Sequence, residues 1–213
     1  MVRDFRLRKF EYYQYPQLIF RVLAPKTPVD GGTSKSLLNF PYIVRMGNFK
    51  IYNPEIDDRH IIPKGRSGIY IICLKEGAAL PANEQKLIYR KFRGLRVLYV
   101  GISGNIYKRI IRQHLKDRGV STLRKTLGVF WKFRLILRNS KSKKTYFSIE
   151  HESTLTAWLM ESTVVYFEAT DEHIYHEQRL IKRLCPVFNL KGNTDELNEQ
   201  SRKEIILRRR FVA

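Results

Sequence analysis

The chain has 213 residues, of which 43% are hydrophobic, and it carries 40 Lys and Arg against 20 Asp and Glu, a formal net charge of +20. This apolar fraction excludes an intrinsically disordered chain, and the length suits one domain with elaborations. No apolar run approaches the roughly 20 residues of a membrane span, and the first ten residues lack the apolar core of a signal peptide. We therefore expect a cytoplasmic protein with no membrane partner.

The positive charge is concentrated in the middle of the chain. The net charge is +4 over residues 1–60, +18 over residues 61–149 and −2 over residues 150–213. Lys and Arg side chains that neutralise phosphates release the counterions that a polyanion has condensed. A segment with a net charge of +18 therefore predicts a nucleic-acid partner rather than an ordinary solvated surface.

Strand-like and helix-like segments alternate along the chain. Residues 1–60 look rich in β-structure, and the best boundary follows at 57–67. The run GIYIICL at 68–74 predicts a central strand that is buried on both faces, because residues of both alternating faces are apolar. The later segments predict strands at 97–102 and 163–169 and helices from 105 onward and over 120–130, 151–161 and 171–184. This order favours an α+β fold, with a basic amphipathic tail at 194–213.

The stretch LYVGISGNIYKRIIRQHL, Leu98–Leu115, joins a strand to a basic helix through two glycines. It lacks the glycine spacings of a P-loop and of a dinucleotide-binding turn, so a glycine cradle for phosphate is excluded. What remains is a strand that ends near a tyrosine and a helix that presents Arg109. The upstream strand ends at a second tyrosine, Tyr70, and the three side chains could converge on one phosphate.

Five elements in this order resemble the GIY-YIG nucleases. GIY at 68–70 and YVG at 99–101 match the two signatures of that family, and Arg109 follows at the distance of its catalytic arginine. Downstream, Glu177 on a predicted helix and Asn189 in PVFN match the glutamate of the family and its proline–asparagine ending. The resemblance implies a metal-dependent nuclease that leaves 5′-phosphate and 3′-hydroxyl ends.

The resemblance also implies an architecture. We expect a small central sheet of three strands, mixed or antiparallel, flanked by helices within residues 61–193. Residues 75–96 and 115–165 exceed what a minimal family member needs, and we interpret them as insertions. Together with the β-rich extension at 1–60, they are candidates for recognising the DNA target.

Two spacings depart from the family pattern. The family's tyrosines usually stand about ten residues apart, whereas Tyr70 and Tyr99 are separated by 29 positions, which indicates an inserted basic hairpin or loop. The family often places a histidine four residues after its arginine. Here Gln113 holds that position and His114 comes fifth, so His114 reaches the site only if the helix is locally irregular.

The resemblance assigns roles to the matching residues. Glu177 would hold one Mg²⁺ or Mn²⁺ ion, since Mg²⁺ often binds through one or two carboxylates and keeps several waters. Tyr70 would orient or deprotonate water if nearby positive charge lowers its pKa, and Tyr99 would hydrogen-bond the water or the phosphate. Arg109 would clamp the phosphate, and Asn189 would tie the end of the site together. The alternatives are packing for the tyrosines, a surface ion pair for Glu177 and a turn cap for Asn189.

A set of cations is expected to contact the DNA backbone. It comprises Arg90, Lys91, Arg93, Arg96, Lys108, Arg112, Lys116, Arg124 and Lys125. The expected partner is double-stranded DNA, and a palindromic cut would favour a homodimer.

Three functional readings follow from these residues. The first is a DNA endonuclease of a restriction or host-defence system. The second is a structure-specific nuclease of repair, recombination or mobile DNA. The third is a nucleic-acid-binding protein with an inactive nuclease core, and the retention of all five motif residues argues against it.

Overall fold

The computed structural model describes residues 48–81, 87–116, 121–137, 139 and 144–210. Most of the predicted N-terminal extension lies outside these ranges. Among the described residues no helix is both long and apolar enough to span a membrane.

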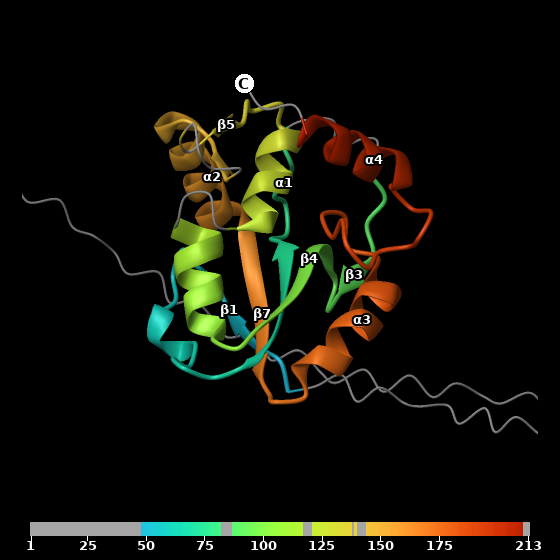
Figure 1. The fold of residues 1–213 in the computed structure, drawn as a ribbon. Helices are drawn as coiled ribbons and strands as arrows, with labels where there is room; N and C mark the ends of the chain where they lie inside the picture. The colour runs from blue at the N-terminus through green and yellow to red at the C-terminus, as the bar shows by residue number, and fades with distance from the viewer. Residues whose placement is uncertain (1–47, 82–86, 117–120, 138, 140–143, 211–213) are drawn as a thin grey trace, which may run out of the picture. The chain divides into compact units, whose positions relative to one another are not determined.

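A five-stranded sheet organises the fold, and all its strand pairs are antiparallel (Figure 1). Its order is β1-β7-β2-β4-β3, with strands β1 (Lys50–Tyr52), β7 (Thr163–Ala169), β2 (Gly68–Leu74), β4 (Leu95–Ser103) and β3 (Lys91–Phe92). The three long central strands correspond to the three that the sequence predicts. The short strands β1 and β3 extend the sheet at its edges, so the predicted strand number of three is too small while the α+β class is confirmed.

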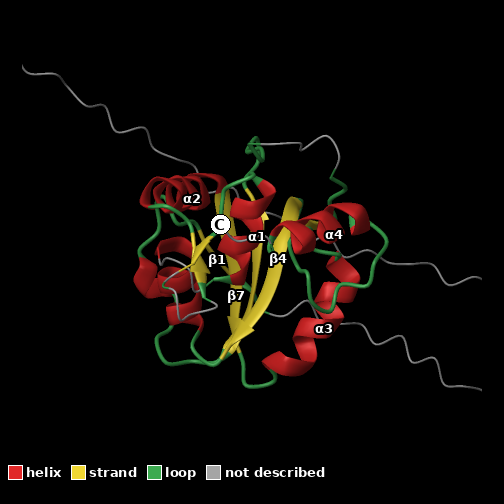
Figure 2. Cartoon of the chain, turned by 45° about the horizontal axis from the view of Figure 1, so that its top comes forward, coloured by secondary structure: helices red, strands yellow, loops and turns green. Residues whose placement is uncertain are grey.

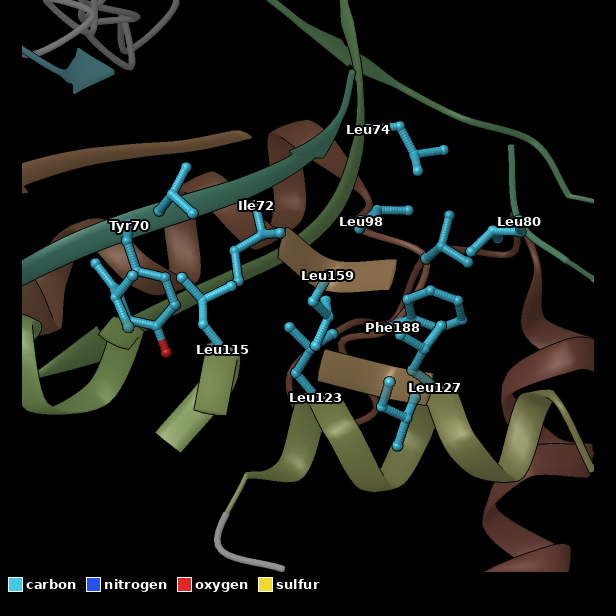
Figure 3. Close-up of a cluster of buried hydrophobic side chains, with 14 of the residues drawn as sticks. Tyr70, Ile72, Leu74, Leu80, Leu98, Leu115, Leu123, Leu127, Leu159 and Phe188 are labelled. Atoms are coloured by element: carbon cyan, nitrogen blue, oxygen red, sulfur yellow. The ribbon is translucent and has the colours of Figure 1, made fainter. Parts of the chain in front are cut away.

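Strand β2 is buried along its whole length, which confirms the prediction from its apolar run. Tyr70, Ile72 and Leu74 face one hydrophobic cluster, whereas Ile69 and Ile71 face another on the opposite side of the sheet. Figure 3 shows the first cluster, in which Leu115, Leu123, Leu127 and Leu159 pack with side chains of β2. Alternation along a strand thus produces two cores from one continuous apolar segment.

Helices cover both faces of the sheet. The first cluster includes side chains from the π-helix η3 and from α1, α2 and α4, whereas α3 supplies Leu180, Ile181 and Leu184 to the second. Figure 2 shows the sheet between α2 and α3. The bounds are η3 (Lys108–Lys116), α1 (Thr122–Phe130), α2 (Ile149–Ser162), α3 (His173–Leu184) and α4 (Glu199–Arg208), with a 3-10 turn η1 (Arg59–Ile61) and a small hairpin of β5 (Ile136–Leu137) and β6 (Thr145–Tyr146).

Serine side chains begin two of these helices. Ser121 and Ser148 cap α1 and α2, and each hydroxyl accepts a hydrogen bond from a backbone N–H three residues later. Such caps satisfy donors that have no partner inside the helix.

Strand β4 is irregular next to its tyrosine. Ile72 is opposite Tyr99 and Cys73 is opposite Val97, which leaves Leu98 as an extra, bulged residue. Leu98 and Tyr99 consequently both pack against the cluster that contains Tyr70. A bulge of this kind commonly aims a side chain into a site.

A tight turn joins β3 to β4. Arg93 and Gly94 both have positive φ, 47° and 84°, as a two-residue hairpin of type I′ requires. The Arg93 guanidinium folds back over the Phe92 and Tyr166 rings, 5.6 and 5.4 Å from their centroids, and donates to the Phe49 carbonyl. Arg93 is thus partly engaged in packing on the sheet.

A buried ion pair fastens η3, α1 and α2 together. Arg124 is 1% exposed, and its Nε and Nη2 donate to Glu152 Oε2 at 3.0 and 2.6 Å. Its Nη1 donates to the His114 carbonyl at 3.0 Å, and Nη2 also donates to Thr156 Oγ1. The expectation that Arg124 contacts DNA is therefore corrected, because its guanidinium is buried and its donors are taken by protein acceptors.

Removal of the Glu152 carboxylate should destabilise the fold strongly. Glu152→Ala leaves the Arg124 guanidinium buried without its counterion, and we expect a loss of roughly 3–5 kcal/mol in the free energy of unfolding. Chemical denaturation measures this loss. The control is Glu161→Ala on an exposed position of the same helix, and equal stability of the two variants would contradict the assignment.

Candidate active site

Two phenol side chains lie side by side on adjacent strands. Tyr70 on β2 and Tyr99 on β4 have ring centroids 6.4 Å apart and an interplanar angle of 28°. Tyr70 is 1% exposed, whereas Tyr99 is partly exposed. The two tyrosines therefore lie on paired strands, as the sequence predicts, although 29 positions separate them.

Gly101 makes room for the Tyr70 ring. The two residues are opposite each other in the β2–β4 pairing. A Cβ on Gly101 would stand 2.3 Å from the Tyr70 hydroxyl oxygen and 2.9 Å from a carbon of the Tyr99 ring. Any side chain here would push both phenols out of place, which explains why a glycine stands at this position of β4.

His114 reaches Tyr70 because the helix that carries it is a π-helix. Residues Lys108–Lys116 form η3, whose i to i+5 pattern brings residues five apart onto one face. His114 Nε2 lies 2.7 Å from the Tyr70 hydroxyl, and the His114 ring centroid lies 5.7 Å from that of Tyr99. The fifth-position histidine thus meets Tyr70, whereas in an α-helix of 3.6 residues per turn positions five apart lie on different faces.

The His114 imidazole is held neutral and oriented from both sides. It is 1% exposed, and burial, with help from Arg109 and Arg124, lowers its pKa from 6.5 to about 3. Its Nδ1 lies 2.6 Å from the hydroxyl of Ser121, the residue that caps α1. A neutral imidazole keeps one nitrogen available as a proton acceptor.

The two phenols are not acidified in the free protein. Burial raises the pKa of Tyr70 well above its ordinary value, and although Arg109 lowers it as expected, burial outweighs this effect. Burial likewise raises the pKa of Tyr99, with a further rise from Glu177 and opposition from Arg109 and Arg209. Tyr70 is therefore a neutral phenol whose hydroxyl is coupled to the His114 imidazole.

Arg109 and Glu177 carry the free charges of this site. Burial raises the pKa of Glu177, against the lowering by Lys191, His173 and Arg109. Within the described part of the chain neither side chain makes a hydrogen bond or an ion pair, although the field of each acts on both phenols. A guanidinium and a carboxylate without protein partners are available to an outside ligand.

Asn189 holds the outer edge of β4. Its amide accepts from Val100 N–H and donates to the Val100 carbonyl, both at 2.8 Å, and it is 5% exposed. The side chain thereby takes the place of a neighbouring strand beside Tyr99. Asn189 thus joins the segment after α3 to β4, and its predicted role in the site stays a prediction.

Glu177 is the carboxylate that could bind a metal ion near the two phenols. Among the residues that the structure describes, no group of three or more His, Cys, Asp or Glu side chains is arranged to hold a metal. Glu177 is the acidic side chain whose field acts on Tyr70 and Tyr99. His173 and Lys191 lie close enough to Glu177 to lower its pKa.

The predicted DNA-binding cations divide into three groups. The exposed ones are Arg90, Lys91, Arg93, Lys108, Arg112 and Lys116. Arg96 and Lys125 are half-buried, and Arg96 donates to the Ala78 carbonyl and stacks 5.3 Å over the Tyr89 ring. Arg124 belongs to the core, as described above.

Two polar contacts of the site lie outside the sequence prediction. Ser121 binds His114, and Arg209, just beyond α4, acts on Tyr99. A serine before a helical segment indicates a helix cap, but nothing in the sequence indicates that the Ser121 hydroxyl also contacts His114. Arg209 stands in a basic run at the end of the chain, and its place beside β4 depends on how α4 packs.

The comparisons with known proteins agree with this geometry. The family model described as the GIY-YIG catalytic domain matches residues 68–211. No curated protein and no solved structure matches the chain. The matched span begins at β2, includes the two tyrosines, η3 and α3, and ends after α4.

Addition of a methyl group at Gly101 should disable the site. In Gly101→Ala the new Cβ would overlap the Tyr70 hydroxyl, so we expect displacement of the phenol and a loss of DNA cleavage of at least a hundredfold, the scale of a misplaced catalytic group. Cleavage of linear DNA measures the effect.

Gly104→Ala is the matched control, because an added Cβ there meets nothing within 4 Å. Cleavage by that variant should equal wild type. Unimpaired cleavage by Gly101→Ala would show that cleavage does not depend on the close approach of Gly101 to Tyr70.

Proposed function

Because the chain belongs to the GIY-YIG family, whose catalytic domain is a nuclease domain, we propose that it is a metal-dependent endonuclease that cuts double-stranded DNA in a restriction system. The observation that carries this proposal is the convergence of five groups. Tyr70 and His114 share a hydrogen bond beside Tyr99, while Arg109 and Glu177 act electrostatically on both phenols and have no ion-pair partner among the described residues.

Glu177 suits a single hard cation such as Mg²⁺. Its carboxylate is half-buried and unpaired among the described residues, and Mg²⁺ accepts one carboxylate when water and substrate oxygens complete its shell. Mn²⁺ prefers the same oxygen ligands. When bound, the ion would supply Lewis-acid stabilisation of charge on the phosphate oxygens.

The Tyr70–His114 pair would move the proton of the attacking water. Tyr70 Oη would accept that proton and pass its own proton to His114 Nε2, which is free when the remaining ring proton sits on Nδ1 beside Ser121. This relay avoids a preformed phenolate, which burial disfavours at Tyr70. Burial and the charges of Arg109 and Arg124 also oppose the imidazolium that forms, so the relay requires the negative charge that builds on the phosphate to offset them.

Arg109 would hold the scissile phosphate. A guanidinium offers a planar fork of donors that matches two phosphate oxygens, and its charge would oppose the charge of the transition state. Tyr99 would donate to the phosphate or to the water. The P–O3′ bond would break, the departing O3′ would take a proton from solvent, and the products would carry 5′-phosphate and 3′-hydroxyl ends.

The restriction role is supported by the size of the elements around this core. Residues 115–165 contribute α1, β5, β6 and α2 between η3 and β7, and residues 75–96 contribute β3. The segment 61–149 carries the excess of Lys and Arg that a DNA backbone attracts. Such elaborations provide surface for reading a target sequence.

Cleavage assays separate the functional readings. The full chain is incubated with long linear DNA and with branched duplexes, with and without Mg²⁺. Discrete fragments from linear DNA are expected for a restriction nuclease. Cuts confined to branches would replace that role with a structure-specific one, and DNA binding without cleavage under Mg²⁺ or Mn²⁺ would contradict the nuclease assignment.

Replacement of the Glu177 carboxylate should separate cutting from binding. Glu177→Gln keeps the size of the side chain but removes the anion, so we expect cleavage to fall by at least a thousandfold while DNA affinity stays close to wild type. Single-turnover cleavage and fluorescence anisotropy measure the two quantities.

The control is Glu196→Gln, an exposed position that should change neither quantity. Wild-type turnover by Glu177→Gln would remove this residue as the metal ligand.

A further inference from the structure

A second pair of cations lies on α1 and at the end of α4, two helices that carry none of the proposed catalytic side chains. Arg209 caps the C-terminal end of α4, and Lys125 lies on α1. These two helices pack together, and Ile205 of α4 shares a core cluster with Leu127 of α1. Both cationic side chains are half-buried. The packing thus brings the end of the chain next to the middle of the basic segment.

Arg209 is close enough to influence both Lys125 and Tyr99. Burial lowers the pKa of Lys125, and the Arg209 charge lowers it further. The same guanidinium lowers the pKa of Tyr99 against the effect of burial. Arg209 is therefore the member of the pair that acts on the same phenol as Arg109 and Glu177.

The pair lacks a counterion in the described chain. Neither Lys125 nor Arg209 makes a hydrogen bond or ion pair through its side chain with a described residue. The carboxylate that acts on Lys125 is Glu152, which is already bound by Arg124. Two like charges that are half-buried together repel each other, and an anion between them would relieve this cost.

We propose that Arg209 and Lys125 form a second phosphate subsite, which binds the backbone phosphate next to the one held by Arg109. This inference rests on the proposed nuclease function. The ligand is a phosphodiester of the substrate strand, because the surrounding segment has the charge of a polyanion binder and a guanidinium fork matches two phosphate oxygens. A strand held at both phosphates would cross Tyr99 in a fixed register.

The test is a binding experiment in the non-cleaving Glu177→Gln chain, so that its outcome does not depend on catalysis. Arg209→Gln, Lys125→Gln and the double variant are titrated with a linear DNA duplex at several salt concentrations. Each single variant should weaken affinity roughly tenfold and reduce the slope of log K against log salt by about 1. If both cations share one phosphate, the double variant should lose less than the product of the single losses.

Arg210→Gln is the matched control, since it removes the same charge from the adjacent exposed position. It should change affinity and salt slope much less than Arg209→Gln. Equal effects of the two variants would overturn the subsite and indicate only a diffuse basic surface.

Stability measurements guard against a merely structural effect. Relief of repulsion predicts that Arg209→Gln unfolds at the same temperature as its parent or higher. A lowered unfolding temperature would count against the subsite.

Arg209→Lys keeps a charge but loses the fork, so its affinity should lie between those of the parent and Arg209→Gln. Parental affinity in Arg209→Gln would contradict the proposal, even if the wild-type chain cleaves DNA.

Discussion

The hydrogen bond between Tyr70 and His114 is the contact on which the site depends, and it imposes a geometry on three parts of the fold. Gly101 must lack a side chain so that the phenol can lie against β4. The helix η3 must be a π-helix so that His114 comes onto the face toward Tyr70. Ser121 must begin α1 next to the imidazole. A π-helical segment is rare and often marks a functional site, and here it absorbs the extra residue before the histidine.

Burial shapes the chemistry of the same groups. It keeps His114 neutral, opposes ionisation of both tyrosines and raises the pKa of Glu177. The proposed relay avoids a standing phenolate, and it depends on the charge of the substrate to stabilise the transient imidazolium. Arg109 and Glu177 make no ion pair with a described residue, and in the proposed function a substrate phosphate and a cation would neutralise them. In the described part of the chain, the buried ion pair is that of Arg124 and Glu152, which joins η3, α1 and α2.

Local signals in the sequence predict most of the fold. The strands at 68–74 and 163–169 and the helix over 171–184 are predicted from neighbouring residues alone, and the structure has strands over the first two segments and α3 over 173–184. The sequence singles out Tyr70 and Tyr99 because each lies in a short signature of three residues. It singles out Arg109 by its distance from Tyr99, and Glu177 by its position on a predicted helix before PVFN. The contact of His114 could not, since residue types do not distinguish a π-helix from an α-helix. The burial of Arg124 and the approach of Arg209 depend on partners far along the chain, and a run of basic residues does not show which of them tertiary packing will bury.

The most direct test of this account is the single-turnover cleavage rate of Tyr70→Phe. Phenylalanine fills the same buried space on β2 but lacks the hydroxyl that meets His114, so the fold should persist while proton transfer is lost. The account predicts a fall in cleavage rate of about 10²–10⁴-fold, the usual contribution of acid–base catalysis, with DNA affinity retained. Cleavage at the wild-type rate would contradict it, because the tyrosine would then serve packing alone.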